Sequence, residues 1–302
     1  MSDIKNEKKG FKSGFVAIVG APNVGKSTLL NQMLGEKISI TSKKPQTTRN
    51  RILGIVHRSF SQLIFIDTPG IHKAKRPLNL RIVEAALSAL GDVDLVLVMI
   101  DVANPDPDAE AFLVKKLKKQ KQPAVLALNK IDLVAKPLLL SIMDRWTKEY
   151  AFEAIIPVSA ILGDQVNEIL DALEALLPEG PPLYPDEALT DMPERFIAAE
   201  MIREKVFRLT GQEIPYSTAV TVESFSEEKR GVLIKIHATI HVERASQKGM
   251  IIGKDGSRLK MIGTEARKEI ERMVGTKVFL KLFVRVHKNW SKDTKALRKL
   301  GY

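Results

Sequence analysis

The stretch GAPNVGKST at positions 20–28 constrains this chain more than any other feature of its 302 residues. It matches the pattern G-x-x-x-x-G-K-[ST], follows the apolar run FVAIV and opens the amphipathic run STLLNQML. A strand, a glycine-rich turn and a helix N-terminus in this order point their backbone amides at phosphate groups. The sequence therefore predicts a nucleotide site in which Lys26 bridges the β- and γ-phosphates and Ser27 binds Mg²⁺. The residues expected to wrap the nucleotide are Gly20, Ala21, Pro22, Asn23, Val24, Gly25, Lys26, Ser27 and Thr28.

Short apolar runs alternate with amphipathic runs around this motif. FVAIVG, LIFID, LVLVMID and AVLALNK are apolar throughout, which is typical of strands buried on both faces. NLRIVEAALSAL and AEAFLVKKLKKQ have helical spacing, and RILGIV is interpreted as a hairpin strand at the sheet edge. The alternation predicts an α/β P-loop domain with a mostly parallel sheet and helices on both faces.

The stretch NKID follows the run AVLAL, at the end of a later strand of the same predicted sheet. A carboxylate at Asp132 can accept hydrogen bonds from N1–H and the 2-amino group of guanine, and adenine offers neither donor. We expect Asn129 to tie loops together and the stem of Lys130 to lie along the base. An isolated N-K-x-D is often only a turn, so the prediction depends on its place after a strand.

The triplet VSA at 158–160 follows the apolar run AIIP. The backbone amides of Ser159 and Ala160 could reach O6 of guanine, and the alternative interpretation is a helix N-cap. Its position in the predicted sheet favours the nucleotide.

The stretch DTPG is a candidate for sensing the terminal phosphate. We expect Asp67 to hold Mg²⁺ through water and the amide of Gly70 to contact the γ-phosphate, with Thr68 and Pro69 between them. The next residue is Ile71, whose side chain accepts no hydrogen bond and cannot aim the attacking water as a glutamine would. Slow intrinsic hydrolysis is therefore expected, with His72 as a weaker candidate for a role in it.

The polar stretch KKPQTTRNR at 43–51 lies between a predicted helix and a predicted strand. Thr47 or Thr48 could complete the Mg²⁺ shell when a triphosphate is bound. The alternative is a solvated loop.

A proline-rich segment divides the chain, because five of the 15 prolines fall between Pro178 and Pro193. Prolines block both helices and strand ladders, so an extended linker is expected. The predicted divisions are a flexible basic arm at 1–13, a GTPase domain at 14–178, the linker at 179–192 and a second domain at 193–302. The patterns after the linker follow the order α-β-β-α-α-β, which describes a small α+β domain.

The net charge of +11 is concentrated in this second part of the chain. Residues 190–302 hold 23 Lys and Arg against 14 Asp and Glu, a net +9, which leaves +2 for residues 1–189. Such an asymmetry indicates a polyanionic partner, either nucleic acid or an anionic membrane surface, and the alternative is a merely soluble basic surface.

A G-x-x-G turn lies between two predicted helices of the basic domain. Asp255 stands where a second P-loop would need Ser or Thr, so a second nucleotide site is excluded. The turn resembles that of a KH domain, and this resemblance implies that Ile251 and Ile252 line an apolar groove and that Lys254 and Arg258 offset phosphate charge. The RNA-binding residues that it implies are Ile251, Ile252, Gly253, Lys254, Asp255, Gly256, Ser257 and Arg258. A plain helix–turn–helix junction is the alternative.

Several other residues are interpreted as structural. His237 and His241 alternate on one predicted strand and are expected on a sheet surface rather than at a metal. Trp290 and Phe283 are expected to pack rather than to meet RNA. The chain has no cysteine, and no apolar run approaches the roughly 18–20 residues that a membrane span requires.

Over residues 14–180, the motifs GAPNVGKST, TTR, DTPG, NKID and SA together resemble the translation-factor-related class of small GTPases. In that class the threonine before Arg49 is the magnesium ligand, which favours Thr48 over Thr47. Relatives with an apolar residue at the position of Ile71 form a recognised group. In some of them an asparagine at the position of Asn23 helps to bind potassium, which acts as a catalytic cation.

The G-x-x-G turn and the element order resemble a KH domain of the bacterial form, in which the turn clamps about four single-stranded nucleotides. The whole chain resembles the bacterial ribosome-assembly GTPases that carry a C-terminal KH domain. This resemblance implies GTP and GDP as ligands, hydrolysis to GDP and phosphate, and binding to the 3′ end of 16S ribosomal RNA during small-subunit maturation. It also implies a cytoplasmic monomer with peripheral association to the inner face of the cell membrane.

Three functional hypotheses remain open at this point. The first is a switch that couples nucleotide state to RNA binding, and the second is a binding module in which GTP is structural. The third is a membrane-surface GTPase whose basic domain binds lipid.

Overall fold

The computed structural model describes residues 10–42, 49, 51–68, 93–120, 122–211, 214, 217–228 and 232–300. The chain forms two compact units, and the main boundary between them follows Asp191. By its contacts, the short stretch 40–42 belongs to the second unit.

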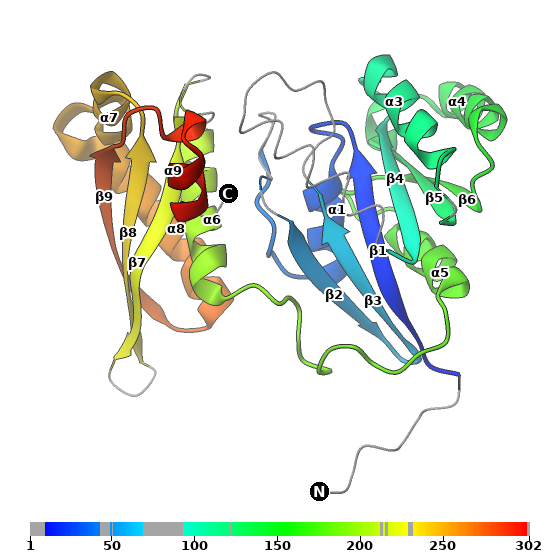
Figure 1. Ribbon diagram of the computed structural model, residues 1–302, viewed down its shortest axis with the longest axis horizontal. Helices are drawn as coiled ribbons and strands as arrows, with labels where there is room; N and C mark the ends of the chain where they lie inside the picture. The colour runs from blue at the N-terminus through cyan, green and yellow to red at the C-terminus, as the bar shows by residue number, and fades with distance from the viewer. Residues whose placement is uncertain are drawn as a thin grey trace, which may run out of the picture. The chain divides into compact units, whose positions relative to one another are not determined.

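The first unit is built on a six-stranded sheet in the order β2-β3-β1-β4-β5-β6 (Figure 1). Strands β1, β3, β4, β5 and β6 are parallel, and β2 runs antiparallel to β3 at the edge. The predicted parallel sheet and its edge hairpin are thus confirmed. The strands are β1 Lys12–Gly20, β2 Ile52–Arg58, β3 Ser61–Asp67, β4 Leu95–Asp101, β5 Ala124–Asn129 and β6 Ala154–Val158.

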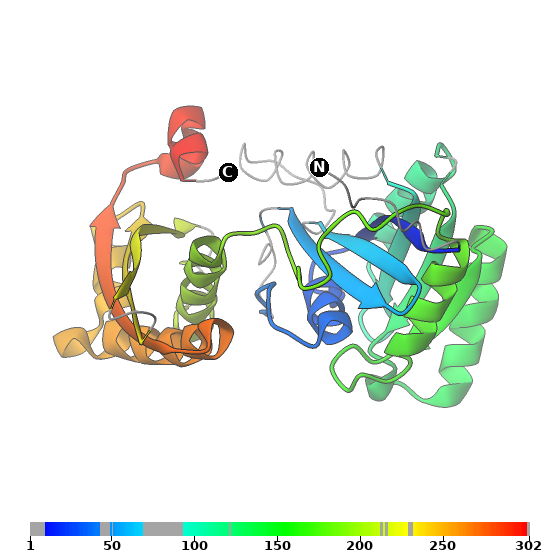
Figure 2. The same ribbon diagram turned by 90° about the horizontal axis from the view of Figure 1, so that it is seen from below.

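Helices cover both faces of this sheet. Leu113 of α3 (Pro107–Leu117) and Trp146 of α4 (Lys136–Glu149) are buried in one core cluster with β4 and β5. On the other face, α1 (Lys26–Leu34) contacts α5 (Val166–Leu176) and the strands β1, β2 and β3 (Figure 2). The helix predicted from NLRIVEAALSAL lies outside the described residues.

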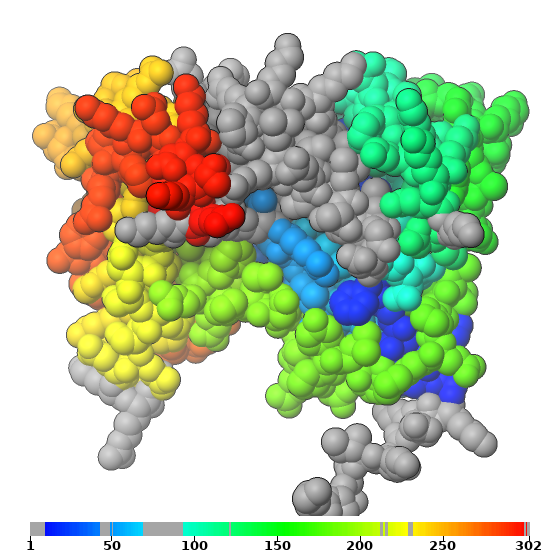
Figure 3. All heavy atoms as spheres, viewed as in Figure 1, coloured from blue at the N-terminus to red at the C-terminus, as the bar shows by residue number. Residues whose placement is uncertain are grey.

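The proline-rich segment is bound to the first unit along its length. The buried side chain of Gln62 accepts a hydrogen bond from the N–H of Leu183 at 2.7 Å. The N–H of Ile55, on the edge strand β2, donates to the carbonyl of Leu189 at 2.9 Å. In the space-filling view the pale-green atoms of this segment lie against the dark-blue atoms of β1 (Figure 3). The linker therefore also completes the edge of the sheet.

Strand β1 begins at Lys12, two residues before the predicted start of the GTPase domain. The N–H of Ser13 donates to the carbonyl of Pro178 at 3.2 Å, and Phe11 is 8% exposed. The last residues of the predicted flexible arm are thus part of the folded unit.

The second unit has the element order α6, β7, β8, α7, α8 and β9, which confirms the predicted α-β-β-α-α-β order. Strands β7 and β8 are antiparallel, and β8 and β9 are parallel. Helices α6 and α8 lie on one side of the three-stranded sheet (Figure 2). The elements are α6 Glu194–Leu209, β7 Ala219–Glu228, β8 Leu233–Val242, α7 Ala245–Ile252, η3 Lys254–Gly256, α8 Ser257–Val274, β9 Lys277–Val286, η4 Trp290–Lys292 and α9 Thr294–Lys299.

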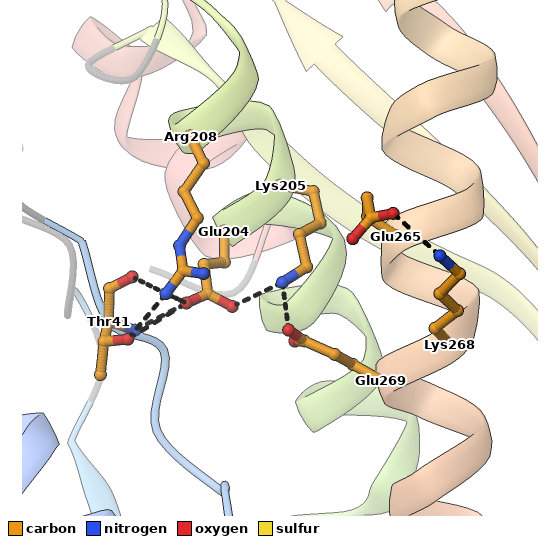
Figure 4. A network of polar contacts seen from close by, with 7 residues as sticks. All are labelled: Thr41, Glu204, Lys205, Arg208, Glu265, Lys268 and Glu269. Carbon is orange, nitrogen blue, oxygen red and sulfur yellow. Dashed lines mark hydrogen bonds and ion pairs between the residues drawn. The ribbon is translucent and has the colours of Figure 1, made fainter.

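Helix α6 carries charged side chains that are buried and paired (Figure 4). The ammonium of Lys205 bonds to the carboxylate of Glu269 on α8 and lies 3.4 Å from Oε2 of Glu204. Oε1 of Glu204 accepts from the N–H and the hydroxyl of Thr41, each at 3.2 Å, and lies 2.7 Å from Arg208. Because removing one partner would leave a buried charge unpaired, this network fixes α6 against α8 and holds Thr41.

Candidate functional site

The first candidate site lies where the parallel strands of the six-stranded sheet end. The loop 21–25 follows β1, Asp67 ends β3, Asn129 ends β5 and Ser159 follows β6. The carboxyl ends of parallel strands meet at one edge of a sheet, which is where such folds bind ligands. The structure thus brings together residues from separate predicted motifs, which are far apart in the sequence.

Gly25 caps the N-terminus of α1 with φ of 108°, a conformation that residues with side chains rarely adopt. A Cβ atom at this position would lie 2.2 Å from Nδ2 of Asn129. The glycine therefore serves both the turn and the close approach of the asparagine.

Lys26 is 6% exposed, and its ammonium donates to the carbonyls of Gly20 at 3.1 Å and Ala21 at 2.9 Å. Burial lowers the pKa of Lys26 to about 8, while the nearby carboxylate of Asp67 acts in the opposite direction. A phosphate group would stabilise the charged form of this lysine, because it places anionic oxygens beside the buried ammonium.

Asp67 is fully buried, and its Oδ2 atom accepts from the hydroxyls of Ser27 at 2.7 Å and Ser39 at 2.8 Å. Burial raises the pKa of Asp67, against the effect of both hydroxyls and of Lys26. Within the described part of the chain, Oδ1 of Asp67 has no hydrogen-bond partner. A buried carboxylate oxygen and a hydroxyl at this distance fit Mg²⁺, which prefers oxygen ligands and retains several waters.

Asn129 joins the two ends of the predicted nucleotide site. It is 2% exposed, its Nδ2 donates to the carbonyl of Val24 at 2.7 Å, and its Oδ1 accepts from the N–H of Ala160 at 2.9 Å. The predicted role in tying loops together is matched by these contacts.

The predicted base-binding residues are also adjacent. The hydroxyl of Ser159 donates to Oδ1 of Asp132 at 2.7 Å, while the Asp132 side chain is exposed. The carboxylate is thus oriented from one side and open on the other, where a base with two donors can approach.

Two residues of this site escaped prediction from the sequence. Asp101 ends β4, forms an ion pair with Lys130 and accepts from the N–H groups of Ala103 and Asn104 at 3.0 Å. Ser39 bonds to Asp67, as described above. The position of Asp101 at the end of the apolar run LVLVMID was an available signal, whereas nothing marks Ser39 in the sequence.

The predicted switch residues lie outside the described residues. These are Thr47, Thr48, Pro69, Gly70, Ile71 and His72. Thr68 is described, and its hydroxyl donates to the carbonyl of Ile18 at 2.7 Å. Asn23 lies at the exposed tip of the P-loop with φ of 65°.

The second candidate site is the turn between α7 and α8. Gly253 has φ of 73° and Gly256 has φ of 76°, so both adopt backbone that favours glycine. Lys254, Asp255 and Ser257 are exposed on the turn. The turn thus presents backbone and one cation to solvent.

One prediction for this turn needs correction. Ile251 is 0% exposed and belongs to the core of the second unit, so it cannot line an open groove, whereas Ile252 is half-buried. Arg258 is exposed, and one N–H of its guanidinium donates to the carbonyl of Met250 near the end of α7, so its predicted role beside phosphate stays a prediction. On a short helix, a shift of one position decides which isoleucine faces inward.

The residues that were interpreted as structural from the sequence differ in their burial. Trp290 is 0% exposed and donates to the carbonyl of Ser217 at 3.1 Å, which confirms packing. Phe283 is 46% exposed, so the prediction that it packs is wrong. His241 is 7% exposed and lies 2.8 Å from the hydroxyl of Thr221, so it is not at the surface as expected. Among the residues that the structure describes, no cluster of acidic residues and histidines could hold a metal.

Comparison with known proteins matches each unit to a family. The sequence model described as "50S ribosome-binding GTPase" matches residues 15–130, and that described as "KH domain" matches residues 213–291. GTPase Era of Geobacter sp. (strain M21) is 57% identical over 298 residues, which cover 98% of this chain and 99% of the relative. GTPase Era of Geotalea uraniireducens (strain Rf4) is 54% identical over 295 residues, with 98% and 99% covered.

Two solved structures are similar over nearly the whole chain, each with a TM-score of 0.93 and 40% identity. Each comparison covers 97% of this chain and 99% of the solved chain. One is an Era variant from Aquifex aeolicus bound to GDP and AlF₄⁻. The other is Era in complex with MgGDPNP and nucleotides 1506–1542 of 16S ribosomal RNA.

Proposed function

The chain belongs to the family of GTPase Era, and from that premise we propose that it couples GTP hydrolysis in the first unit to RNA binding by the second. The observation that carries the nucleotide part of the proposal is the buried carboxylate of Asp67, oriented by Ser27 beside the ammonium of Lys26. Such an arrangement of two oxygen ligands and one cation suits a metal-bound triphosphate.

In the proposed site, the loop 21–25 and the N-terminus of α1 hold the phosphates through backbone amides. Lys26 exchanges its contacts with Gly20 and Ala21 for the β- and γ-phosphates, and Ser27 and Asp67 hold Mg²⁺. When bound, the metal neutralises charge that develops on the phosphate oxygens. We assign Thr48 and Gly70 the predicted contacts to metal and γ-phosphate.

Selection of guanine falls to Asp132, since only guanine offers it two donors. Ser159 fixes one carboxylate oxygen, and the N–H of Ala160 donates to Asn129, so a contact from this N–H to O6 of guanine would have to share the donor. The stem of Lys130, anchored by Asp101, lies along the base in this proposal.

No glutamine follows Gly70 to orient the attacking water, because the next residue is Ile71. We propose slow intrinsic hydrolysis that a potassium ion at Asn23 accelerates. Asn23 is exposed at the tip of the P-loop, between Gly20 and Lys26 of the predicted phosphate-binding loop. Replacing potassium by sodium should slow hydrolysis if the cation acts, and Ile71→Gln should accelerate it if the missing side chain sets the limit.

The proposed RNA partner is the 3′ end of 16S ribosomal RNA, bound during maturation of the small subunit. The complex of the Era relative with nucleotides 1506–1542 supports this partner. The open turn of Gly253, Lys254 and Gly256 supports the G-x-x-G contact, because glycines admit a close phosphate backbone.

The location of the protein in the cytoplasm, its monomeric state and a peripheral contact with anionic membrane remain predictions. Along the parts of the chain that the structure describes, no helix combines the length and apolar character of a membrane span. Sedimentation with vesicles of anionic and neutral lipid tests the membrane contact.

Single-turnover hydrolysis of GTP, with and without RNA of nucleotides 1506–1542, tests the proposed function. We expect the rate to rise with RNA and to disappear in Lys26→Ala. A rate that RNA never changes would favour the alternative in which GTP is only a structural cofactor.

A further inference from the structure

Strand β9 presents a row of basic and aromatic side chains on one face. Lys277, Phe279, Lys281, Phe283 and Arg285 are all exposed, and the two rings are 50% and 46% exposed. The residues between them are half-buried or buried, and Val278 belongs to the core under α8. Because side chains alternate along a strand, the basic and aromatic row lies on the face of the sheet opposite to the helices.

The neighbouring strand extends this face. In the register of β8 and β9, Lys235 lies beside Phe279 and His237 lies beside Lys281, and both are half-buried. Lys235 is paired with Glu228 of β7 at 2.7 Å, so the acidic side chains lie on the far strand. The open cations are therefore those of β9 itself.

The rings and the cations are already arranged together. The ammonium of Lys281 lies 5.2 Å from the centroid of the Phe283 ring. Successive residues on one strand face are about 6.8 Å apart, which places the two rings about 13 Å apart with one cation between them. Exposed rings on a sheet can stack unpaired bases, and interleaved cations can offset the phosphates that join them.

We propose that this outer face of β9 binds a single-stranded RNA segment, at a site separate from the G-x-x-G turn. The turn lies between α7 and α8, which pack on the opposite face of the sheet. One RNA chain could thus contact the domain at both places, with bases stacked on Phe279 and Phe283. The inference rests on the proposed RNA binding of the domain and adds a second surface to it.

Protection of a sheet edge and membrane binding both explain this row of side chains less well than RNA binding does. Lysines on an edge strand discourage pairing with other sheets, but that role does not require two half-exposed rings. A membrane-binding face gathers its apolar side chains apart from its charges, whereas here a cation stands at every second outward position.

The test measures binding of fluorescent RNA with nucleotides 1506–1542 to the full chain by anisotropy. The aromatic variants are Phe279→Ala, Phe283→Ala, and Leu and Trp at the same positions. Leucine keeps the apolar volume and removes the ring, whereas tryptophan keeps a ring. Lys254→Glu, in the turn, serves as the comparator at the other site. The variants should leave GTP hydrolysis without RNA unchanged, because β9 has no part in the nucleotide site.

We expect Ala and Leu to weaken binding about five- to 150-fold per ring, and Trp to retain it. Replacing Lys277, Lys281 and Arg285 by Gln should reduce the slope of log Kd against log salt by about 2. The inference would be overturned if the leucine variants bound RNA like the parent. It would also be overturned if binding to anionic vesicles needed these side chains and RNA binding did not. If the parent itself fails to bind the RNA, the proposed function fails instead.

Discussion

Replacing Asn129 by Ala removes the side chain that joins the P-loop to the loop of Ser159 and Ala160. Asn129 donates to the carbonyl of Val24 at 2.7 Å and accepts from the N–H of Ala160 at 2.9 Å. Val24 is 4% exposed and Ala160 is 2% exposed, so water cannot readily replace either contact. Two buried backbone groups would thus lose their partners.

The magnitude follows from these two contacts. Leaving one buried donor or acceptor unsatisfied costs about 1–3 kcal/mol, so Asn129→Ala should cost about 2–6 kcal/mol in total. Part of this loss should appear as a lower free energy of unfolding of the first unit. The remainder should appear as weaker binding of GDP, because the two loops would no longer be held in place.

The assay combines GDP titration with hydrogen exchange measured on peptides. We expect faster exchange for peptides that contain Val24 or Ala160, and unchanged exchange in β7 and β8 as an internal control. Asn129→Asp is the matched variant, because it keeps the acceptor for Ala160 and loses the donor to Val24. It should therefore keep the contact to Ala160 and lose that to the P-loop, at the further cost of a buried carboxylate.

The reasoning would be refuted if Asn129→Ala changed GDP affinity by less than about twofold and left exchange at Ala160 unaltered. That result would mean that the two backbone groups find other partners, and that the asparagine does not hold the site together.

Three further predictions follow from the same contacts. Asp132→Asn should weaken GTP binding about 100-fold or more and improve binding of xanthosine triphosphate, whose O2 accepts where guanine donates; equal affinities for both would contradict the assigned contact. GDP affinity should fall about fourfold between pH 7 and pH 8.5, because Lys26 with a pKa of about 8 must gain a proton to hold phosphate, and calorimetry in two buffers should detect the uptake. A GDP affinity that does not change with pH would show that binding does not require protonation of Lys26. Glu269→Ala should destabilise the second unit by about 3 kcal/mol in urea unfolding, and Lys205→Met in addition should restore part of the loss; no recovery would show that the buried pair is not the cause.

The fold was largely predictable because the relevant signals are local. Strands buried on both faces are continuously apolar, and the P-loop pattern contains its own strand, turn and helix. The element order of the second unit could be predicted from the change in hydrophobic periodicity after the prolines. These features need no knowledge of which strand lies beside which.

The remaining contacts depend on residues that only the fold brings together. Ser39 meets Asp67 across 28 positions, and Lys130 meets Asp101 across 29. The hydrogen bonds of the proline-rich segment to β2 could not be predicted from the sequence either, because prolines indicate only that a helix or strand is interrupted. The exposure of Phe283 depends on which face of β9 packs against the helices. The alternation of residues along β9 is compatible with either face, so it did not predict this exposure.

The central claim is that nucleotide and RNA act on one another through this chain. Coupling between two sites is reciprocal, so RNA bound to the second unit must change the affinity of the first for GTP. The most direct measurement is the Kd of a non-hydrolysable GTP analogue with and without saturating RNA of nucleotides 1506–1542. The account predicts tighter binding with RNA, by about fivefold or more, and no such change for GDP. Equal affinities for the analogue in both conditions would contradict it.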